Sequence, residues 1–488
     1  MTTLEHTAAP TDPAGTTGVV AGWLAGLELD AVPERVIGRA AHLTLDGVGC
    51  ALIGAQLPWS RAATEVVLQL EGTGPATVAG WGRSTTAPAA ALLNGTFIQG
   101  FELDDYHPLG PLHSASVVLP AALAAAEHTK ATTGRVTTGA ELLRALIAGY
   151  ELGPRVGMAL HGGDLISRGW HSGSVFGTLA AAAAAGCVLR LSPAGFEDAL
   201  GLAATQSSGL MAAQYEAMCK RMHHGFSARA GVYSAALAAG GFTGIKRVLE
   251  RDYGGYLSTF GLGGKPPDPA AITATLGRDW EIERISIKPY AAQGGTHAAI
   301  DAIAAIRRRR PLDPARVAEI RLAVGHTVYH HGVWDLRRPM NEITAQMSLA
   351  YGTAVALLDG TVMVEQFLPP RINRDDVWDL MRRVSVRHDP TIDALGPTAR
   401  LRTEVDIVFT DGTVEREVVD TPSGGLDHPL PDDAITAKFA TVTASVLDAD
   451  RRAAIRAGVL GLRELPDVGE LIGLLAPPVP SALESVPG

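Results

Sequence analysis

Apolar residues recur at spacings of three and four through the first half of the chain, which is the pattern of packed α-helices. The clearest stretches cover residues 34–51, 85–97, 115–129, 139–159, 175–189 and 196–210. Loops rich in Gly, Pro and Asp separate them, and these residue types end helices and favour turns. We therefore predict a large helical domain over residues 18–265, preceded by a disordered lead-in over residues 1–17.

The pattern changes after a Gly/Pro-rich linker at residues 263–269. Apolar and polar residues alternate over 280–287 and 317–324, which predicts half-buried strands. Helices are expected at 296–307 and 344–358. Residues 399–409 and 413–419 predict a hairpin, because Asp411-Gly412 suits a tight turn.

Helical periodicity returns near the C-terminus, most clearly over residues 434–447. The predicted fold is therefore mainly α: a large all-helical domain with an inserted smaller α+β domain over 266–430, and C-terminal helices over 431–488 that return to the helical domain. Aromatic residues make up only 5% of the chain, while Ala, Leu and Gly crowd the apolar stretches. This composition favours closely packed helices.

The charge distribution argues against nucleic acid as a partner. The formal net charge is −10, and no block of Lys and Arg forms a phosphate-binding stripe. The most apolar run, residues 175–189, is shorter than the roughly 20 residues needed to span a bilayer. The first residues lack a basic start and an apolar core, so a signal peptide is not expected. We expect a cytoplasmic protein without membrane partners.

Ionisable side chains interrupt the helical pattern at five places, and the first is the richest in carboxylates. Asp104 and Asp105 stand beside Tyr106, and His113 follows shortly before a predicted helix. Asp also favours helix starts, so a structural cap is the alternative to a reactive site.

The second and third clusters combine histidines with cations. His171 precedes a buried helix, whose N-terminus favours a bound anion. Lys220, His223 and Arg229 share one short stretch, and Arg and Lys are the residues that recognise carboxylates. A structural loop histidine and a solvated charge run are the alternatives.

The remaining two clusters lie in the predicted α+β domain. Lys288 ends a predicted strand, and Gln293 and His297 flank a Gly-rich loop that could cradle an anion. The fifth cluster, which we expect at the surface, contains His326, His330 and His331.

Metal and cofactor patterns are absent from the sequence. Its 15 histidines include no HExxH and no His/Cys quartet at zinc-finger spacing. The three cysteines, Cys50, Cys187 and Cys219, are too far apart for a zinc ribbon or a cysteine-ligated iron–sulfur cluster. GxGxxG and P-loop patterns are also missing, so we expect no metal and no cofactor.

Taken in order, the clusters resemble the MmgE/PrpD family, whose members include 2-methylcitrate dehydratase, cis-aconitate decarboxylase and iminodisuccinate epimerase. The resemblance spans about residues 19–475. It rests on Leu103-Asp104-Asp105 with His113, Gly169-Trp170-His171, Lys220 with His223 and Arg229, Lys288 with His297, and Ala350-Tyr351 leading to Leu357-Leu358-Asp359-Gly360. Each motif alone is weak, but their shared order and spacing are specific.

The resemblance implies a homodimer in which the α+β domain is a lid and the site lies in the cleft beneath it. It implies that this cleft is faced by Asp104, Asp105, His113, His171, Lys220 and His223, with Lys288 reaching in from the lid. The implied partner is a small polycarboxylate substrate.

The chain departs from the family pattern at several positions. Relatives commonly carry Asp-Phe-Asp-Asp-Thr where this chain has Glu102-Leu103-Asp104-Asp105-Tyr106, and Lys-Pro-Leu-His where it has Lys220-Arg221-Met222-His223. The usual His-Pro-Gly becomes His113-Ser114-Ala115, and Gln293 stands where a Cys or His is often found. Tyr106 adds bulk and Arg221 adds a cation, so these departures bear on the substrate.

The family's reactions share negative charge that develops beside a carboxylate, and fixed cations lower the barrier to it. His113 and His171 are the expected acid–base pair, because imidazole titrates near neutrality. The full set of catalytic candidates is His113, His171, Asp104, Asp105 and Lys220. The substrate-binding candidates are His223, Arg229, Lys288, Tyr106 and Gln293.

The leading expectation is a cofactor-independent hydro-lyase that resembles 2-methylcitrate dehydratase and acts on a small di- or tricarboxylate through a carbanion. Activity like that of cis-aconitate decarboxylase or of iminodisuccinate epimerase is an alternative. A non-catalytic binding protein with this fold is another.

Overall fold

The computed structural model describes residues 8–214, 218–396 and 399–484. Helices hold 58% of the residues and strands 8%, which confirms the predicted mainly α fold. The chain forms two compact units. Unit 1 comprises the described parts of Met1–Gly100, Asp104–Ile285 and Asp432–Ser481, and unit 2 those of Phe101–Leu103, Ser286–Pro431 and Ala482–Gly488.

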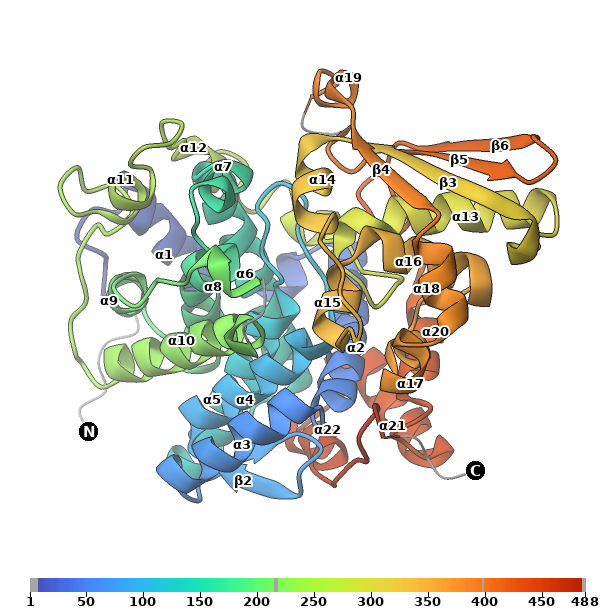
Figure 1. Ribbon diagram of the computed structural model, residues 1–488. Coiled ribbons are helices and arrows are strands. Elements are labelled where there is room, and N and C mark those ends of the chain that lie inside the picture. The colour runs from blue at the N-terminus through green and yellow to red at the C-terminus, as the bar shows by residue number, and fades with distance from the viewer. Residues whose placement is uncertain (1–7, 215–217, 397–398, 485–488) are drawn as a thin grey trace. The chain divides into compact units, whose positions relative to one another are not determined.

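Unit 1 is helical apart from one short antiparallel pair of strands, β1 (Ala76–Val78) and β2 (Arg83–Thr85) (Figure 1). Its N-terminal helices are α1 (Thr16–Gly26), α2 (Glu34–Gly54), α3 (Pro58–Glu71), α4 (Ala87–Ile98), α5 (Ala115–Thr133) and α6 (Gly139–Ala159). There follow α7 (Gly162–Ser167), α8 (Ser172–Val188), α9 (Pro193–Ala204), α10 (His223–Ala239), α11 (Tyr256–Phe260) and α12 (Ala270–Thr273). The C-terminal segment adds α20 (Asp432–Thr443), α21 (Ala449–Leu460) and α22 (Gly469–Leu475).

Helix α8 is the centre of unit 1, and all of its residues are buried. It packs against α5, α6, α9 and α10. The contact with α10 is very close, because a Cβ placed on Gly231 would lie 2.2 Å from the Cβ of Ala181. The Ala/Gly-rich composition thus allows two helix backbones to approach each other.

The helices predicted from periodicity are confirmed as α2, α4, α5, α6, α8 and α9, with ends displaced by a few residues. The largest displacement concerns α9, which ends at Ala204 although periodicity continues to residue 210. Helix α2 is long and apolar enough to cross a membrane by length and composition alone. However, 83% of its most apolar window is buried, as in the core helix of a globular unit.

The strand predicted over residues 280–287 is wrong. This segment instead contains the 3-10 turn η5 (Glu281–Arg284). Its apolar residues, Trp280, Ile282, Ile285 and Ile287, are all buried, but their spacing alternates between two and three, which a tight turn satisfies as well as a strand.

Residues 8–17 also differ from the expected disordered lead-in. The backbone N–H and hydroxyl of Thr11 donate to the buried carboxylate of Glu197, and α1 already begins at Thr16. The rest of that prediction, residues 1–7, lies outside the described residues.

Unit 2 contains a four-stranded sheet of order β4-β3-β5-β6. The strands are β3 (Val317–Val324), β4 (Val384–His388), β5 (Thr403–Phe409) and β6 (Val414–Val419). Strands β3 and β4 are parallel, while β3/β5 and β5/β6 are antiparallel. The helices are α13 (His297–Arg309), α14 (His326–Gly332), α15 (Glu342–Met347), α16 (Leu349–Asp359), α17 (Pro369–Ile372), α18 (Asp375–Met381) and α19 (Pro390–Asp393). Helix α13 packs against β5 and β6.

The predicted hairpin is confirmed as β5 and β6, joined at Asp411-Gly412, where Gly412 has a φ of 84°. The helix predicted over 344–358 is divided in two. Ser348 between α15 and α16 is extended, and its hydroxyl accepts the N–H of Tyr351, so this serine caps a new helix within an apolar run.

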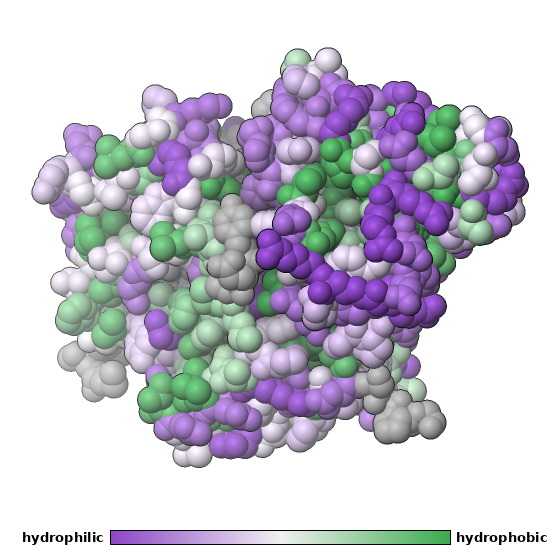
Figure 2. Space-filling view, viewed as in Figure 1, coloured by the Kyte–Doolittle hydropathy of each residue, from purple (hydrophilic) through white to green (hydrophobic). Residues whose placement is uncertain are grey.

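Apolar side chains are scattered among polar ones over the visible face of the molecule, as Figure 2 shows. Phe226, Tyr233 and Leu237 on α10 are exposed at helical spacing. The expected homodimer stays a prediction.

Candidate active site

Three long helices of unit 1 begin beside one another, and each carries histidine at or just before its first turn. His113 stands two residues before α5, and His171 is the N-cap residue of α8. His223 and His224 are the first two residues of α10. Because helix N-termini carry partial positive charge, this convergence favours an anion.

The four imidazole rings form one contiguous group, which we call the histidine cluster (His113, His171, His223 and His224). The ring centroids of His171 and His223 are 4.2 Å apart. Those of His171 and His224 are 5.3 Å apart, and those of His113 and His224 are 5.0 Å apart. Three segments distant in sequence therefore meet through these rings.

Small residues of α8 and α10 hold the cluster together. The hydroxyl of Ser227 donates to the carbonyl of Gly173 at 2.9 Å, and that of Ser174 donates to the carbonyl of His223 at 3.3 Å. The His224 ring lies directly on Gly173, since a Cβ there would be 2.0 Å from Nε2 of His224. Glycine at position 173 thus makes room for the ring.

The adjacent aspartates have different surroundings. Oδ2 of the buried Asp104 is 3.0 Å from Nδ1 of His113, whereas the carboxylate of Asp105 accepts the N–H of Ala115 at 3.0 Å. Burial, and then the charge of Asp104, raise the pKa of Asp105 well above its ordinary value. Asp105 therefore acts as a structural anchor for the start of α5, as the helix-cap alternative proposed, and Asp104 orients a histidine.

A second buried ion pair lies near these aspartates. Oδ1 of Asp46 on α2 is 2.6 Å from Nζ of Lys438 on α20. Burial raises the pKa of Asp46, and the adjacent ammonium opposes that shift. The C-terminal segment thus supplies a cation close to the carboxylates around the histidine cluster.

Three of the four rings, those of His171, His223 and His224, favour the neutral form. Burial lowers the pKa of His171 and of His224 well below the ordinary value, and neighbouring histidines and Lys220 lower them further. Burial and Lys220 lower the pKa of His223 to about 4. Lys220 belongs to the 3-10 turn η4 (Met218–Met222) that leads into α10. Uncharged imidazoles beside a lysine and helix N-termini suit an incoming anion.

Several ring nitrogens of the cluster lack a hydrogen-bond partner among the described residues. These are Nδ1 of His171, Nδ1 of His223 and both nitrogens of His224. Buried polar atoms are almost always hydrogen-bonded in folded proteins. The arrangement therefore has unfilled hydrogen-bonding capacity that a polar ligand would satisfy.

The structure does not bring every predicted site residue to the cluster. The guanidinium of Arg229 lies 5.3 Å from the ring centroid of the exposed Phe226. Tyr106 is half-buried in the segment that carries Asp104. The guanidinium of Arg221, the extra cation noted in the sequence, is buried 5.8 Å from the Trp59 ring, so it contributes to packing.

The two predicted site residues of unit 2 have local partners. Nζ of the buried Lys288 donates to Oε2 of Glu102 at 3.0 Å. The side chain of Gln293 accepts the N–H of Gly295 and caps η6 (Gly294–Thr296). Their roles in substrate binding stay predictions.

The fifth sequence cluster lies at the surface of unit 2, as expected. His326 and His330 are exposed, with ring centroids 4.1 Å apart, and His388 pairs with Asp393 nearby. Across the described ranges, no group of three or more His, Cys, Asp or Glu has a geometry that could hold a metal ion.

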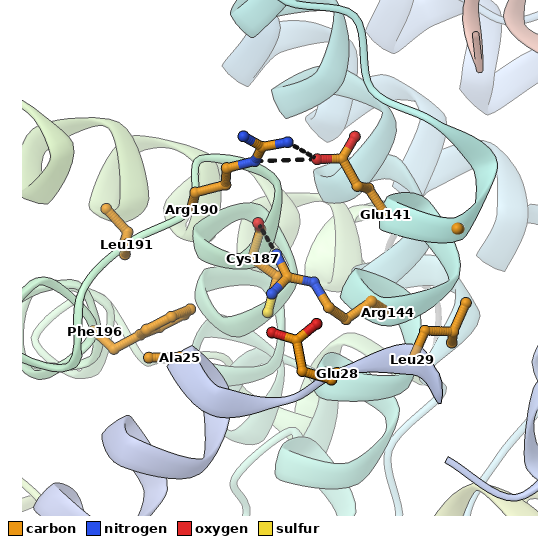
Figure 3. A pocket seen from close by; sticks show the side chains of 10 residues that line it. Ala25, Glu28, Leu29, Glu141, Arg144, Cys187, Arg190, Leu191 and Phe196 are labelled. Carbon is orange, nitrogen blue, oxygen red and sulfur yellow. Dashed lines mark hydrogen bonds and ion pairs between the residues drawn. The ribbon is translucent and has the colours of Figure 1, made fainter. Parts of the chain in front are cut away.

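A cavity of about 430 Å³ in unit 1 lies between α1, α6, α8 and α9, apart from the histidine cluster. Figure 3 shows Arg190 directed at Glu141 and Arg144 at the carbonyl oxygen of Cys187, which it reaches at 2.8 Å. Because cations stabilise helix C-termini, Arg144 is explained by the end of α8.

His224 belongs to the histidine cluster but was not among the site residues predicted from the sequence. Adjacent histidines on a helix point in different directions, and sequence alone does not show that both reach one group. The signal that could have found it is Gly173, next to the predicted His171, where close backbone approach was needed.

Both domains of one protein family match the chain. The MmgE/PrpD N-terminal domain matches residues 19–267, and the MmgE/PrpD C-terminal domain matches residues 290–463.

Individual relatives match over nearly their whole length. The chain is 42% identical over 470 residues to the cis-aconitate decarboxylase-like protein oryM of Aspergillus oryzae, which covers 94% of this chain and 97% of that protein. It is 41% identical over 483 residues to the cis-aconitate decarboxylase of Aspergillus terreus, with 96% and 97% covered. Identity to the cis-aconitate decarboxylase of Homo sapiens is 28% over 470 residues, with 94% of each chain covered.

Proposed function

Because this chain belongs to the MmgE/PrpD family of enzymes, we propose that it is a lyase that decarboxylates cis-aconitate or a closely related tricarboxylate. The observation that carries the proposal is the 41–42% identity to the two Aspergillus proteins over at least 94% of each chain. These relatives support the decarboxylase alternative better than the dehydratase activity expected from the breadth of the family.

The chemistry requires one bond cleavage and one proton. Loss of CO₂ from the carboxylate on the methylene carbon of cis-aconitate leaves an electron pair that spreads over an allylic carbanion. A proton added beside the remaining conjugated carboxylate gives 2-methylidenebutanedioate, whereas a proton added at the former methylene carbon gives 2-methylbut-2-enedioate. In sum, a trianion and one proton become a dianion and CO₂.

The histidine cluster has the properties that such a substrate needs. Lys220 and the N-termini of α5, α8 and α10 offer positive charge to three carboxylates. Since a nearby carboxylate raises the pKa of an imidazole, substrate binding would turn a neutral histidine into a proton donor. The low pKa values of these histidines therefore fit a group that takes up its proton together with an anion.

Within this proposal, each residue has a defined role. Asp104 holds Nδ1 of His113, which leaves Nε2 for proton transfer. His171 delivers the proton to the carbanion, and Lys220 stabilises the developing charge. His223 binds a substrate carboxylate.

To test this, the purified protein is incubated separately with cis-aconitate, 2-methylcitrate and iminodisuccinate. Products are identified by proton NMR, and the release of CO₂ is measured. We expect CO₂ and a five-carbon unsaturated diacid from cis-aconitate only. His171→Ala should abolish turnover, whereas His128→Gln, a change on α5 outside the cluster, should not. An alkene from 2-methylcitrate without CO₂ would instead establish the dehydratase, and inversion of iminodisuccinate the epimerase.

A further inference from the structure

His224 is fully buried at the middle of the histidine cluster. Its ring is 5.0 Å from that of His113 and 5.3 Å from that of His171, at interplanar angles of 64° and 74°. Neither of its nitrogens has a partner among the described residues. A neutral imidazole has one donor and one acceptor, so two hydrogen-bonding positions are open here.

The ring spacings match those of hydrogen-bonded imidazoles. An N–H···N bond spans about 2.9 Å and each nitrogen lies about 1.2 Å from its ring centre, which gives about 5.3 Å between centres. A half-turn of a histidine ring exchanges its nitrogen and carbon positions. The spacings thus leave room for His224, after such a half-turn, to accept a hydrogen bond from one neighbour and donate one to the other.

One end of the histidine cluster is exposed to solvent and the other end is buried. The side chain of His113 is 22% exposed, whereas His171 and His224 are buried. Decarboxylation consumes one proton in every turnover, so a buried donor must be recharged each time. A path from water to His171 is needed, and His224 lies between the exposed and the buried histidine.

We propose that His224 relays protons from His113 to His171, so that the buried donor is recharged from water after each turnover. The inference rests on the proposed decarboxylase function and deepens it by adding a residue to the site.

The transfer is balanced at every step. His171 gives its proton to the carbanion carbon, and a new C–H bond forms. The N–H of His224 then protonates the vacated nitrogen of His171, and His113 protonates the opposite nitrogen of His224. Nε2 of His113 regains its proton from water. The net change is one proton moved from solvent to product, which equals the proton that decarboxylation consumes.

The charges around His224 suit this role. Its neighbours are His113 and Asp104 from the segment before α5, His171 at the start of α8, Lys220 in the turn before α10, and His223 at the start of α10. Burial foremost lowers the pKa of His224, so its ring rests in the neutral form that can accept at one nitrogen and donate at the other. The Nε2 edge of the ring lies against Gly173, which contributes no competing polar side chain.

The test compares His224→Gln with His128→Gln as the matched control. Glutamine retains a donor and an acceptor but cannot carry a proton from one to the other. For His224→Gln we expect kcat on cis-aconitate to fall on the order of 10²-fold, in the range for lost proton transfer, with KM within about threefold and an unchanged Tm. The control should turn over like the unaltered protein.

Rates in mixtures of H₂O and D₂O separate relay from packing. A relay moves several protons, so a plot of the wild-type kcat against the deuterium fraction of the solvent should be curved. For His224→Gln the same plot should be linear. Turnover of His224→Gln within threefold of wild type, or a loss confined to KM or Tm, overturns the proposal.

A measurement without substrate separates this inference from the proposed function. In protein labelled with ¹⁵N-histidine, we expect NMR scalar couplings across hydrogen bonds from His224 to both His113 and His171. The signals are assigned by comparing the spectra of single histidine variants. If cis-aconitate is not turned over but both couplings are present, the decarboxylase proposal fails and the imidazole chain stands. Absence of both couplings overturns the relay whatever the substrate.

Discussion

Nδ1 of His113 lies 3.0 Å from Oδ2 of Asp104, and this contact distinguishes two adjacent carboxylates. Asp105, one residue on, bonds to the backbone N–H of Ala115 instead. The same dipeptide therefore orients the His113 ring and fixes the start of the helix that follows it.

The two aspartates should respond differently to replacement by asparagine. For Asp104→Asn we expect kcat to fall by about 10²–10³-fold, because an amide cannot stabilise the protonated His113 ring. For Asp105→Asn the amide oxygen can still accept the N–H of Ala115, so the main effect should be about 1 kcal/mol of lost stability. Steady-state kinetics and urea unfolding of both variants test this. Equal losses of kcat would contradict the division of roles.

Gly173 should be essential for the cluster although it carries no side chain. An alanine Cβ there would meet Nε2 of His224 at 2.0 Å, so Gly173→Ala must displace the ring or the helix. We expect at least tenfold lower kcat. Gly163→Ala, in a helix with open space around the new Cβ, is the control and should keep full activity. Unimpaired Gly173→Ala would show that the ring position is not needed.

The histidine cluster should make stability depend on pH. The pKa of His223 is lowered from 6.5 to about 4, and those of His171 and His224 are lowered as well. Between about pH 4 and 6.5 the unfolded chain therefore binds more protons than the folded one, and the free energy of unfolding falls as pH decreases.

Urea unfolding at several pH values checks this expectation. His223 contributes at most about 3.5 kcal/mol, at about 1.4 kcal/mol per pKa unit. The double variant His223→Gln/His224→Gln should show a shallower decline over the same window. An unchanged slope in that variant would assign the pH dependence to other groups.

Unit 2 contains a buried ion pair whose partners should be strongly coupled. Glu102 has a φ of 56°, a conformation that residues other than glycine rarely adopt, and it accepts from Lys288 at 3.0 Å. Removing one partner leaves a buried charge, which costs about 3–5 kcal/mol. We expect Lys288→Met and Glu102→Gln each to destabilise the protein, and the double variant to lose clearly less than their sum. Additive losses measured in a double-mutant cycle would contradict the coupling.

The elements with strong periodicity could be predicted because their burial pattern is local. The hairpin at Asp411-Gly412 and the helices around the buried α8 are of this kind. The strand prediction for residues 280–287 was wrong because apolar residues spaced two and three apart fit a strand and a 3-10 turn equally well. Ser348 divides the predicted helix because its hydroxyl caps the following turn. The spacing of apolar residues carries no information about such a cap.

The sequence predicted which residues come together better than it predicted the contacts that each of them makes. Sequence named His113, His171 and His223, which the structure brings together. It could not separate Asp104 from Asp105, because their roles depend on which group each carboxylate meets after folding. It favoured Arg229 over His224, because the direction of a side chain on α10 is set by packing against α8.

The most direct test of the central claim is proton NMR of the wild-type protein with cis-aconitate in D₂O. We expect stoichiometric CO₂ and a five-carbon unsaturated diacid that carries one solvent deuteron at a single carbon. Unchanged cis-aconitate with folded protein, or hydration of its double bond without loss of CO₂, would contradict it.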